Sequence, residues 1–254
     1  MTAKDIVSEL TKLANPAAKK NWVNNGGAKE PCLGVKVEDM KKIQKRVKTD
    51  YPLALDLYDT GIADAMYLAG YITDDAKMTK KDLQKWIEAA TSDWVSGYMV
   101  PWVASAGMHG RELALKWMDS KNETIATAGW QTYSSIVAIK DDADLDLAEI
   151  KTLLQRAAKA IHQQPDRLKW AMNGFVIAIG CYVLPLHKLA VETANSIGKI
   201  AVAPAGKCSS IPFAPEQIKK SRSPRRHRQE AQVGEVLSGL RSRPRRAWPP
   251  CATP

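Results

Sequence analysis

The sequence predicts an all-α fold, an α-solenoid of HEAT- or armadillo-like antiparallel helix pairs with a concave face. From residue 2 to about residue 198, apolar residues recur at helical spacing, and strand-like alternation is confined to Lys199–Val202 and Ser209–Phe213. Capping residues and glycines divide this region into about a dozen short helices. Two such helices with their turns span roughly 35–45 residues, which matches the period of HEAT and armadillo units. Each pair in a solenoid buries its apolar face on the next pair and leaves a long concave surface free.

The expected helices follow one another with short connections. Thr2 caps the first helix, and Pro16 begins the second, which ends at Gly26-Gly27. A further cap is expected at Asp93, directly before the helix that starts at Trp94. The helices that follow the second are Val37–Lys48, Pro52–Thr60, Ile62–Thr73, Lys80–Ala90, Trp94–Ala106, Arg111–Asp119, Glu123–Ile139, Leu145–His162, Pro165–Val183 and Pro185–Ile197.

The composition excludes several classes of protein. With 45% hydrophobic and 25% charged residues, the chain has the composition of a soluble globular protein. Its longest apolar stretch, Phe175–Leu186, is shorter than the ~20 residues that a membrane span needs. The four cysteines have neither a CxxC pattern nor metal-ligand spacing. We therefore expect a cytoplasmic protein with free thiols, no membrane contact, no metal and no cofactor.

The net charge of +10 is unevenly distributed. Residues 1–220 carry 25 Lys and 4 Arg against 25 acidic residues, a net charge of +4. Residues 221–254 carry 8 Arg, no Lys and 2 Glu, a net charge of +6. The charge on the first 220 residues permits a nucleic-acid-binding face without requiring one.

Catalytic motifs give no reaction class, because P-loop, GxSxG and HExxH patterns are missing. The lysines are more informative. Lys41, Lys45 and Lys48 fall at spacings of four and three along one expected helix, and Lys81 and Lys85 lie near the start of another. These side chains form either solvated helix faces or contacts for DNA phosphates.

Tryptophan is a second candidate for ligand contact. Seven of the eight tryptophans lie in the helical region, where packing in the core is the default. Trp94 and Trp130 share their expected helices with Tyr98 and Tyr133, among Ser, Thr and Gly residues. Aromatic rings beside small polar residues suit a cleft that stacks a flat ligand such as a nucleobase. Packing in the core remains the alternative for both tryptophans.

Four segments carry a family resemblance that covers about residues 4 to 220. They are Asn24-Asn25-Gly26-Gly27-Ala28-Lys29-Glu30-Pro31-Cys32-Leu33-Gly34-Val35-Lys36, Ala54–Gly61 followed by Met66–Gly70, Ala128-Gly129-Trp130, and Lys169–Cys181 with its core Ala171-Met172-Asn173-Gly174-Phe175. In this order they resemble the bacterial HEAT-like-repeat DNA alkylation repair proteins, the AlkD-like family. The resemblance implies an α-solenoid whose concave, basic face holds duplex DNA, and excision of alkylated purines as the family's activity.

The resemblance also implies which residues would carry excision, and this sequence departs from them. Glycosylase members use a Trp-plus-Asp cluster on one helix, an Arg on the next repeat and a further Trp. Here the cluster falls on 93–98 with Gly97 at the Asp position, Tyr133 stands at the Arg position, and the later Trp falls near Gly174-Phe175. A carboxylate is needed to stabilise the oxocarbenium-like sugar, and Asp93 is the only one nearby. The chain therefore looks more similar to the branch of the family that binds DNA, including branched structures, without releasing bases.

Three hypotheses follow, each for a monomer. The first is a DNA-binding protein that holds duplex or branched DNA. Its expected contacts are Lys41, Lys45, Lys48, Lys81 and Lys85, with Trp94, Trp130, Tyr133 and Phe175 lining the cleft. The second is an alkylpurine DNA glycosylase with Asp93 as the catalytic residue. The third is a protein-binding α-solenoid without a DNA role.

Residues 221–254 fit neither the family nor the rest of the chain, so the expected domain covers residues 1–220. A frameshift explains the change, because codons for His227–Gly234 can be chosen that read Ile-Gly-Lys-Lys-Arg-Lys-stop after a shift of one base. This reading resembles the basic end usual in the subfamily and predicts that the natural protein ends near residue 232 in another frame. The alternative is a genuine disordered basic tail that adds nonspecific DNA affinity.

Overall fold

The computed structural model describes residues 1–202 and 210–221, and these residues contain helices and no strand. The all-α prediction is thus confirmed, whereas the strand-like segments expected at 199–202 and 209–213 form no strand in their described residues. Most of the expected tail, residues 222–254, lies outside the described part. No single described helix has the length and hydropathy of a membrane span, although Asp166–Tyr182 and Leu184–Ile197, bent by 112°, reach them as a pair.

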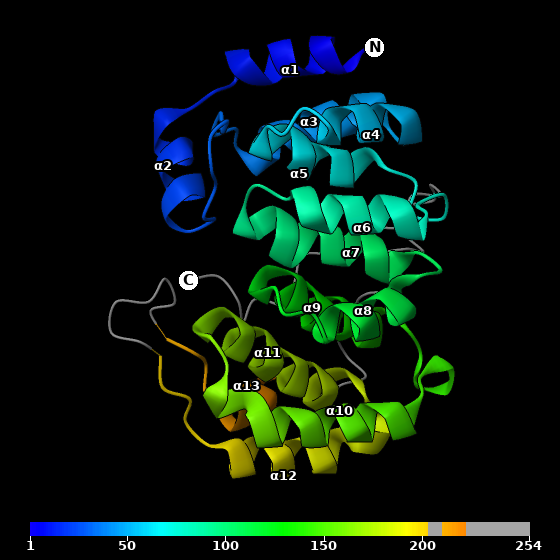
Figure 1. Ribbon diagram of the computed structural model, residues 1–254, viewed down its shortest axis with the longest axis vertical. Helices are drawn as coiled ribbons and strands as arrows, with labels where there is room; N and C mark the ends of the chain where they lie inside the picture. Colours follow the sequence, from blue (N-terminus) through cyan, green and yellow to red (C-terminus); the bar gives the residue numbers. More distant parts are fainter. Residues whose placement is uncertain (203–209, 222–254) are drawn as a thin grey trace. The chain divides into compact units, whose positions relative to one another are not determined.

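The chain divides into two compact units, residues 1–133 and 134–254, and the division falls inside helix α9 (Glu123–Ile139). In the first unit α5 is the central helix, because all ten of its residues are buried. Helices α1, α3 and α4 pack against α5, α6 packs on α7, and α7 packs on α8 (Figure 1). The helices before α9 are α1 (Ala3–Lys12), α2 (Pro16–Asn24), α3 (Val37–Val47), α4 (Tyr51–Tyr58), α5 (Ala63–Ile72), α6 (Lys80–Ala89), α7 (Val100–Ala106) and α8 (Gly110–Met118).

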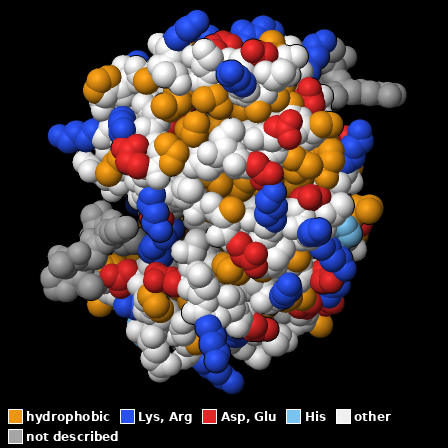
Figure 2. Space-filling model, turned by 45° about the horizontal axis from the view of Figure 1, so that its top comes forward, with side chains coloured by type: hydrophobic (Ala, Val, Ile, Leu, Met, Phe, Trp, Pro, Cys, Tyr) orange, Lys and Arg blue, Asp and Glu red, His pale blue; other side chains and the backbone are white. Residues whose placement is uncertain are grey.

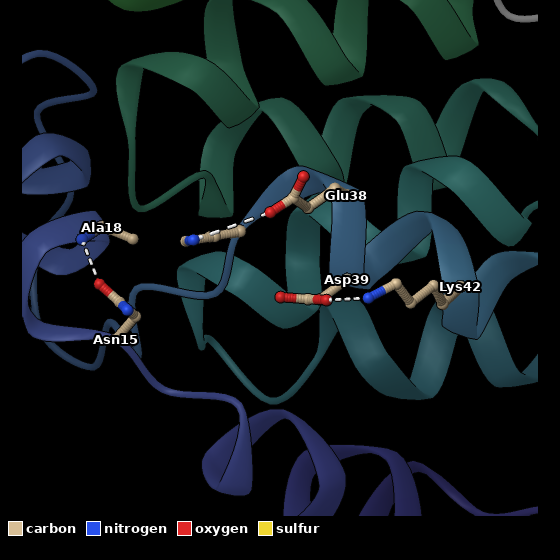
Figure 3. Close-up of polar contacts among 6 residues, drawn as sticks. Asn15, Ala18, Glu38, Asp39 and Lys42 are labelled. Carbon is tan, nitrogen blue, oxygen red and sulfur yellow. Dashed lines mark hydrogen bonds and ion pairs between the residues drawn. The ribbon is translucent and has the colours of Figure 1, made fainter.

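The first helices begin where the sequence predicts, with Thr2 as the cap of α1 and Pro16 at the start of α2. Thr2 and Asp5 form a capping box at α1, and the Thr2 backbone N–H lowers the pKa of Asp5. Asn15 accepts a hydrogen bond from the Ala18 N–H at 2.9 Å, with Pro16 in the first turn of α2 (Figure 3). Thr79 caps α6 in the same way as Thr2 caps α1.

Helices α4, α6 and α8 are joined directly to one another by side chains. Tyr58 of α4 stacks on Trp86 of α6 with ring centroids 4.1 Å apart, and its hydroxyl donates to the Trp86 carbonyl. The Trp117 indole of α8 donates to Gln84 of α6 at 3.0 Å, and Lys80 pairs with Glu112 at 2.6 Å. Each helix of this series thus contacts the next, which is the nearest-neighbour packing expected of repeat proteins.

The second unit is built around α11 (Asp166–Tyr182), against which α10 (Leu147–Ala160), α12 (His187–Ile197) and α13 (Ala214–Lys220) pack. Helix α13 was not predicted, because seven residues are too few to establish a helical period. Its Ile218 packs against Gly180 of α11, and the Asn173 side chain donates to the Pro212 carbonyl at 2.9 Å. The segment 210–221 therefore lies on a face of α11.

Candidate nucleic-acid interface

Aromatic rings from α2, from α5 and from the segment that follows α6 meet in the first unit, beside a π-helix, η1 (Val95–Met99). Trp22 of α2 packs edge-on against Trp94 and against Tyr67 of α5, with ring centroids 4.8 and 5.4 Å apart. Tyr67 packs in turn against Tyr71 at 5.5 Å. Trp22, Tyr67 and Tyr71 are buried, whereas Trp94 is half-buried. Trp94 is therefore the ring through which this cluster reaches the surface.

The turn after α2 lies directly against Asp93 and Trp94. The Asp93 N–H donates to the Gly26 carbonyl at 2.7 Å. A Cβ at Gly27, whose φ is +54°, would lie 2.5 Å from an Asp93 carboxylate oxygen, and a Cβ at Gly26 would lie 2.8 Å from a ring carbon of Trp94. Only glycine allows this contact at both positions without displacing a neighbour. The double glycine of the family-like segment therefore holds the turn against the site.

The sequence predicted that Asp93 caps this helix, and that prediction is wrong. Ser92 caps it instead: its hydroxyl accepts a hydrogen bond from the Val95 N–H at 3.1 Å. Asp93 is half-buried in the first turn, with its carboxylate beside Gly27. The carboxylate thus lies next to Trp94, and its catalytic role stays a prediction.

The expected single helix over 94–106 is divided into η1 and α7, and Pro101 explains why. Proline has no N–H to donate to the carbonyl four residues earlier, here Gly97, and its ring crowds that carbonyl. The preceding turn widens instead, and the Val100 N–H donates to the Val95 carbonyl. Single π-turns of this kind often occur at functional sites.

Gly97, the position expected to carry a catalytic carboxylate in glycosylases, lies at the middle of η1. It is buried, yet a Cβ built on it would meet no atom of another element within 4 Å. There is room for a side chain at this position, and the chain supplies none.

Three of the aromatic residues expected to line the cleft are instead packed inside the protein. Trp130, Tyr133 and Phe175 are 1%, 2% and 0% exposed. A ring stacks on a nucleobase only through an accessible face, so these positions do not support the predicted DNA contact. Their helices α9 and α11 are buried around most of their circumference, so these rings are enclosed wherever they point.

The predicted lysines differ in whether their charges are already paired. Lys41 and Lys45 are exposed on α3, and neither forms an ion pair within the described residues. Lys42, between them, pairs with Asp39 at 2.7 Å, which raises the pKa of the Lys42 ammonium (Figure 3). Lys41 and Lys45 therefore have charges available for a phosphate.

The other three predicted lysines are each in a different setting. Lys81 is exposed and has no ion pair in the described part of the chain, whereas Lys85 pairs with Asp59 at 2.7 Å. Lys48 does not share the helix face of Lys41, because α3 ends at Val47 and Lys48 has a φ of 62°. On the face drawn in Figure 2, the Lys and Arg side chains of the described residues are interspersed with Asp and Glu side chains and form no continuous basic patch.

Asp64 anchors the loop that precedes α3, a function that the sequence analysis missed. It is fully buried on α5, and its two carboxylate oxygens accept hydrogen bonds from the Leu33 and Val35 N–H groups, each at 2.6 Å. Burial raises the pKa of the neighbouring Cys32 thiol to about 12, and Asp64 adds to the effect. A single charged residue within the apolar stretch 62–73 was the available signal, because a buried carboxylate needs donors.

Comparisons with known proteins agree with this architecture. The family described as DNA alkylation repair enzyme matches residues 6–207. Two uncharacterised proteins, from Listeria innocua serovar 6a and Listeria monocytogenes serovar 1/2a, are each 30% identical over 227 residues, which cover 88% of this chain and 98% of theirs.

A solved structure is similar to this chain in both sequence and fold. It comes from a family of proteins related to the HEAT-like repeat DNA glycosylases with affinity for branched DNA structures. The two chains are 36% identical, with a TM-score of 0.82, and the match covers 87% of this chain and 93% of that one. The chain therefore belongs to the DNA alkylation repair enzyme family and has its all-α, HEAT-like repeat fold.

Proposed function

We propose that this protein binds duplex or branched DNA through phosphate contacts and does not excise bases. The observation that carries the proposal is the pair Gly97 and Tyr133, which leaves the site without the carboxylate and the arginine that the family's chemistry uses. The exposed lysines of the first unit and the branched-DNA affinity of the structural relative's family support the binding role.

The physical basis of the missing chemistry is the charge on the sugar. As an alkylated purine leaves, positive charge develops on the deoxyribose, and a fixed carboxylate lowers the energy of that state. Asp93 is the carboxylate beside Trp94, but it is packed against the Gly27 turn. Phosphate binding requires none of this, because each lysine that neutralises a phosphate releases counterions and adds salt-dependent affinity.

DNA binding can be tested by titrating the full chain onto fluorescent duplex and four-way-junction DNA between 50 and 200 mM salt. Lys41→Ala, Lys45→Ala and Lys81→Ala should each reduce the slope of log K against log salt by about 0.9. Lys42→Ala is the matched control, since it changes the net charge equally on the same helix but removes an ammonium already paired with Asp39. Binding that is indifferent to salt would favour a protein-binding solenoid instead.

Excision is tested separately, with methylated duplex DNA and chromatographic detection of free base. We expect no release from either the native protein or Asp93→Asn. Release by the native protein that is lost in Asp93→Asn would show an active glycosylase with a relocated carboxylate and would refute the second half of the proposal.

A further inference from the structure

We infer that Tyr98 and Trp102 form a platform on which unpaired DNA bases stack at a branch point. The inference rests on the proposed DNA-binding function and adds the part of the DNA that this surface contacts. Trp102 is not among the contacts expected from the sequence, and Tyr98 was noted there only as a neighbour of Trp94.

The two rings lie at the margin of the core: both are half-buried, and Trp102 packs in part against core residues. Val95, Met99 and Val103 are fully buried, and a Cβ at Gly70 of α5 would collide with the Met99 sulfur. This contact fixes one face of the helix against α5. Trp94, Tyr98 and Trp102 precede these buried residues by one position each, and all three are half-buried. The helix is therefore held by one side and carries a row of aromatic rings at its margin.

The angle between the Tyr98 and Trp102 rings suits unstacked bases better than the stacked bases of a duplex. The Tyr98 and Trp102 ring centroids are 6.4 Å apart, and the ring planes are inclined by 63°. Neighbouring bases in a duplex are parallel and already stacked on each other, so they cannot lie flat on two rings with this inclination. Two unstacked bases can, and such bases occur where strands separate. Stacking on aromatic side chains is also tolerant of sequence, because every base has a π face.

The surroundings favour DNA over an apolar partner as the occupant. The double-glycine turn lies against Trp94 and leads into Lys29, whose side chain is exposed and whose N–H donates to the Thr91 carbonyl at 2.9 Å. A cationic residue is thus held close to the ring row, as a strand with phosphates on its backbone requires. The affinity for branched DNA in the structural relative's family points to the same ligand.

The test measures how tightly the full-length protein binds two DNAs of equal length and charge. One is a fully paired duplex, and the other is a three-way junction with a short unpaired segment that contains 2-aminopurine at the branch. Trp102→Leu and Tyr98→Leu keep an apolar but smaller side chain and remove the aromatic face, whereas Trp102→Phe and Tyr98→Phe keep a ring. Met108→Ala, which changes a residue 82% exposed just after α7, is the control.

We expect the native protein to quench 2-aminopurine and to prefer the junction over the duplex by about 5- to 100-fold. The Leu variants should lose the quenching and most of this preference with duplex affinity unchanged, and the Phe and Met108 variants should keep both. An equal loss for both DNAs, or an undiminished preference in the Leu variants, would overturn the platform while leaving the proposed phosphate binding intact. Failure of the native protein to quench would overturn it independently of any variant. Absence of binding to either DNA would refute the proposed function and the platform together.

Discussion

Replacing Lys48 with glycine should stabilise the protein and weaken its DNA binding at the same time. Lys48 follows the last residue of α3 with φ 62° and ψ −134°, and within the described residues no other non-glycine residue has a positive φ. A side chain is strained in this conformation because its Cβ approaches the backbone, whereas glycine adopts it freely.

The net effect follows from two opposing terms. A non-glycine residue in such a sparsely populated conformation costs about 1–3 kcal/mol, which Lys48→Gly removes. The greater freedom of glycine in the unfolded chain costs about 0.4–1 kcal/mol. The free energy of unfolding should therefore rise by about 0.5–2 kcal/mol. If the Lys48 ammonium contacts a phosphate, its loss reduces the salt slope of DNA binding by about 0.9.

Urea unfolding and salt-dependent DNA titration measure these two effects, and Lys48→Ala separates them. Alanine removes the charge but keeps the Cβ and its strain, so only glycine should raise the stability, while both variants lose the same DNA affinity. A lower free energy of unfolding in Lys48→Gly than in Lys48→Ala would refute the strain at this position. An unchanged salt slope in both would show that Lys48 contacts no phosphate.

Three further predictions concern the loop and an ion pair of the first unit. Asp64→Ala removes two charge-assisted hydrogen bonds worth about 1.5–3 kcal/mol each, so the free energy of unfolding measured in urea should fall by about 3–6 kcal/mol. A loss below about 1 kcal/mol would contradict the anchoring role. Because burial raises the pKa of Cys32 to about 12, iodoacetamide at pH 8 should modify it only after unfolding, and rapid labelling of the native protein, located by mass spectrometry, would disprove a closed loop. The hydrogen bond from Lys80 lowers the pKa of Glu112 below its usual 4.5, so the pair contributes stability above that pH that is lost as the pH falls through the lowered pKa. Native protein and Glu112→Gln should accordingly differ in urea stability at pH 7 and converge at pH 3; a difference that persists at pH 3 would have another cause.

Much of the fold could be predicted because its signals are local. Thr2, Asn15 and Thr79 cap their helices through side chains only three residues away from the groups they bind. The exceptions required information from elsewhere in the chain. Helix α13 is too short to show a period, and it is fixed by contacts such as that of Ile218 with Gly180. The π-turn depends on Pro101 acting on Gly97, a relation that a regular helical pattern does not reveal.

The site was only partly predictable, because position on a helix does not by itself distinguish a core ring from a surface ring. Trp94 and Trp130 are in similar local sequences, yet Trp94 is half-buried and Trp130 is enclosed. The environment of Trp94 is set by neighbours distant in sequence, Trp22 and the Gly26 turn, which leave the ring half-buried. The lysines show the same limit, since nothing near Lys85 in the sequence indicates that Asp59 pairs with it.

The aromatic rings at η1 and the glycine at position 97 both favour the proposed function, DNA binding without base excision. Excision requires a carboxylate placed against the deoxyribose. At Gly97, where the family resemblance places that carboxylate, there is room for a side chain but none is present. Binding is less demanding, because stacking and phosphate contact depend on exposed rings and cations that tolerate small displacements. The Asp93 carboxylate lies beside Gly27, and the turn that carries Gly27 is held by the hydrogen bond from the Asp93 N–H to the Gly26 carbonyl. This contrast is why we propose a protein that holds DNA without excising bases.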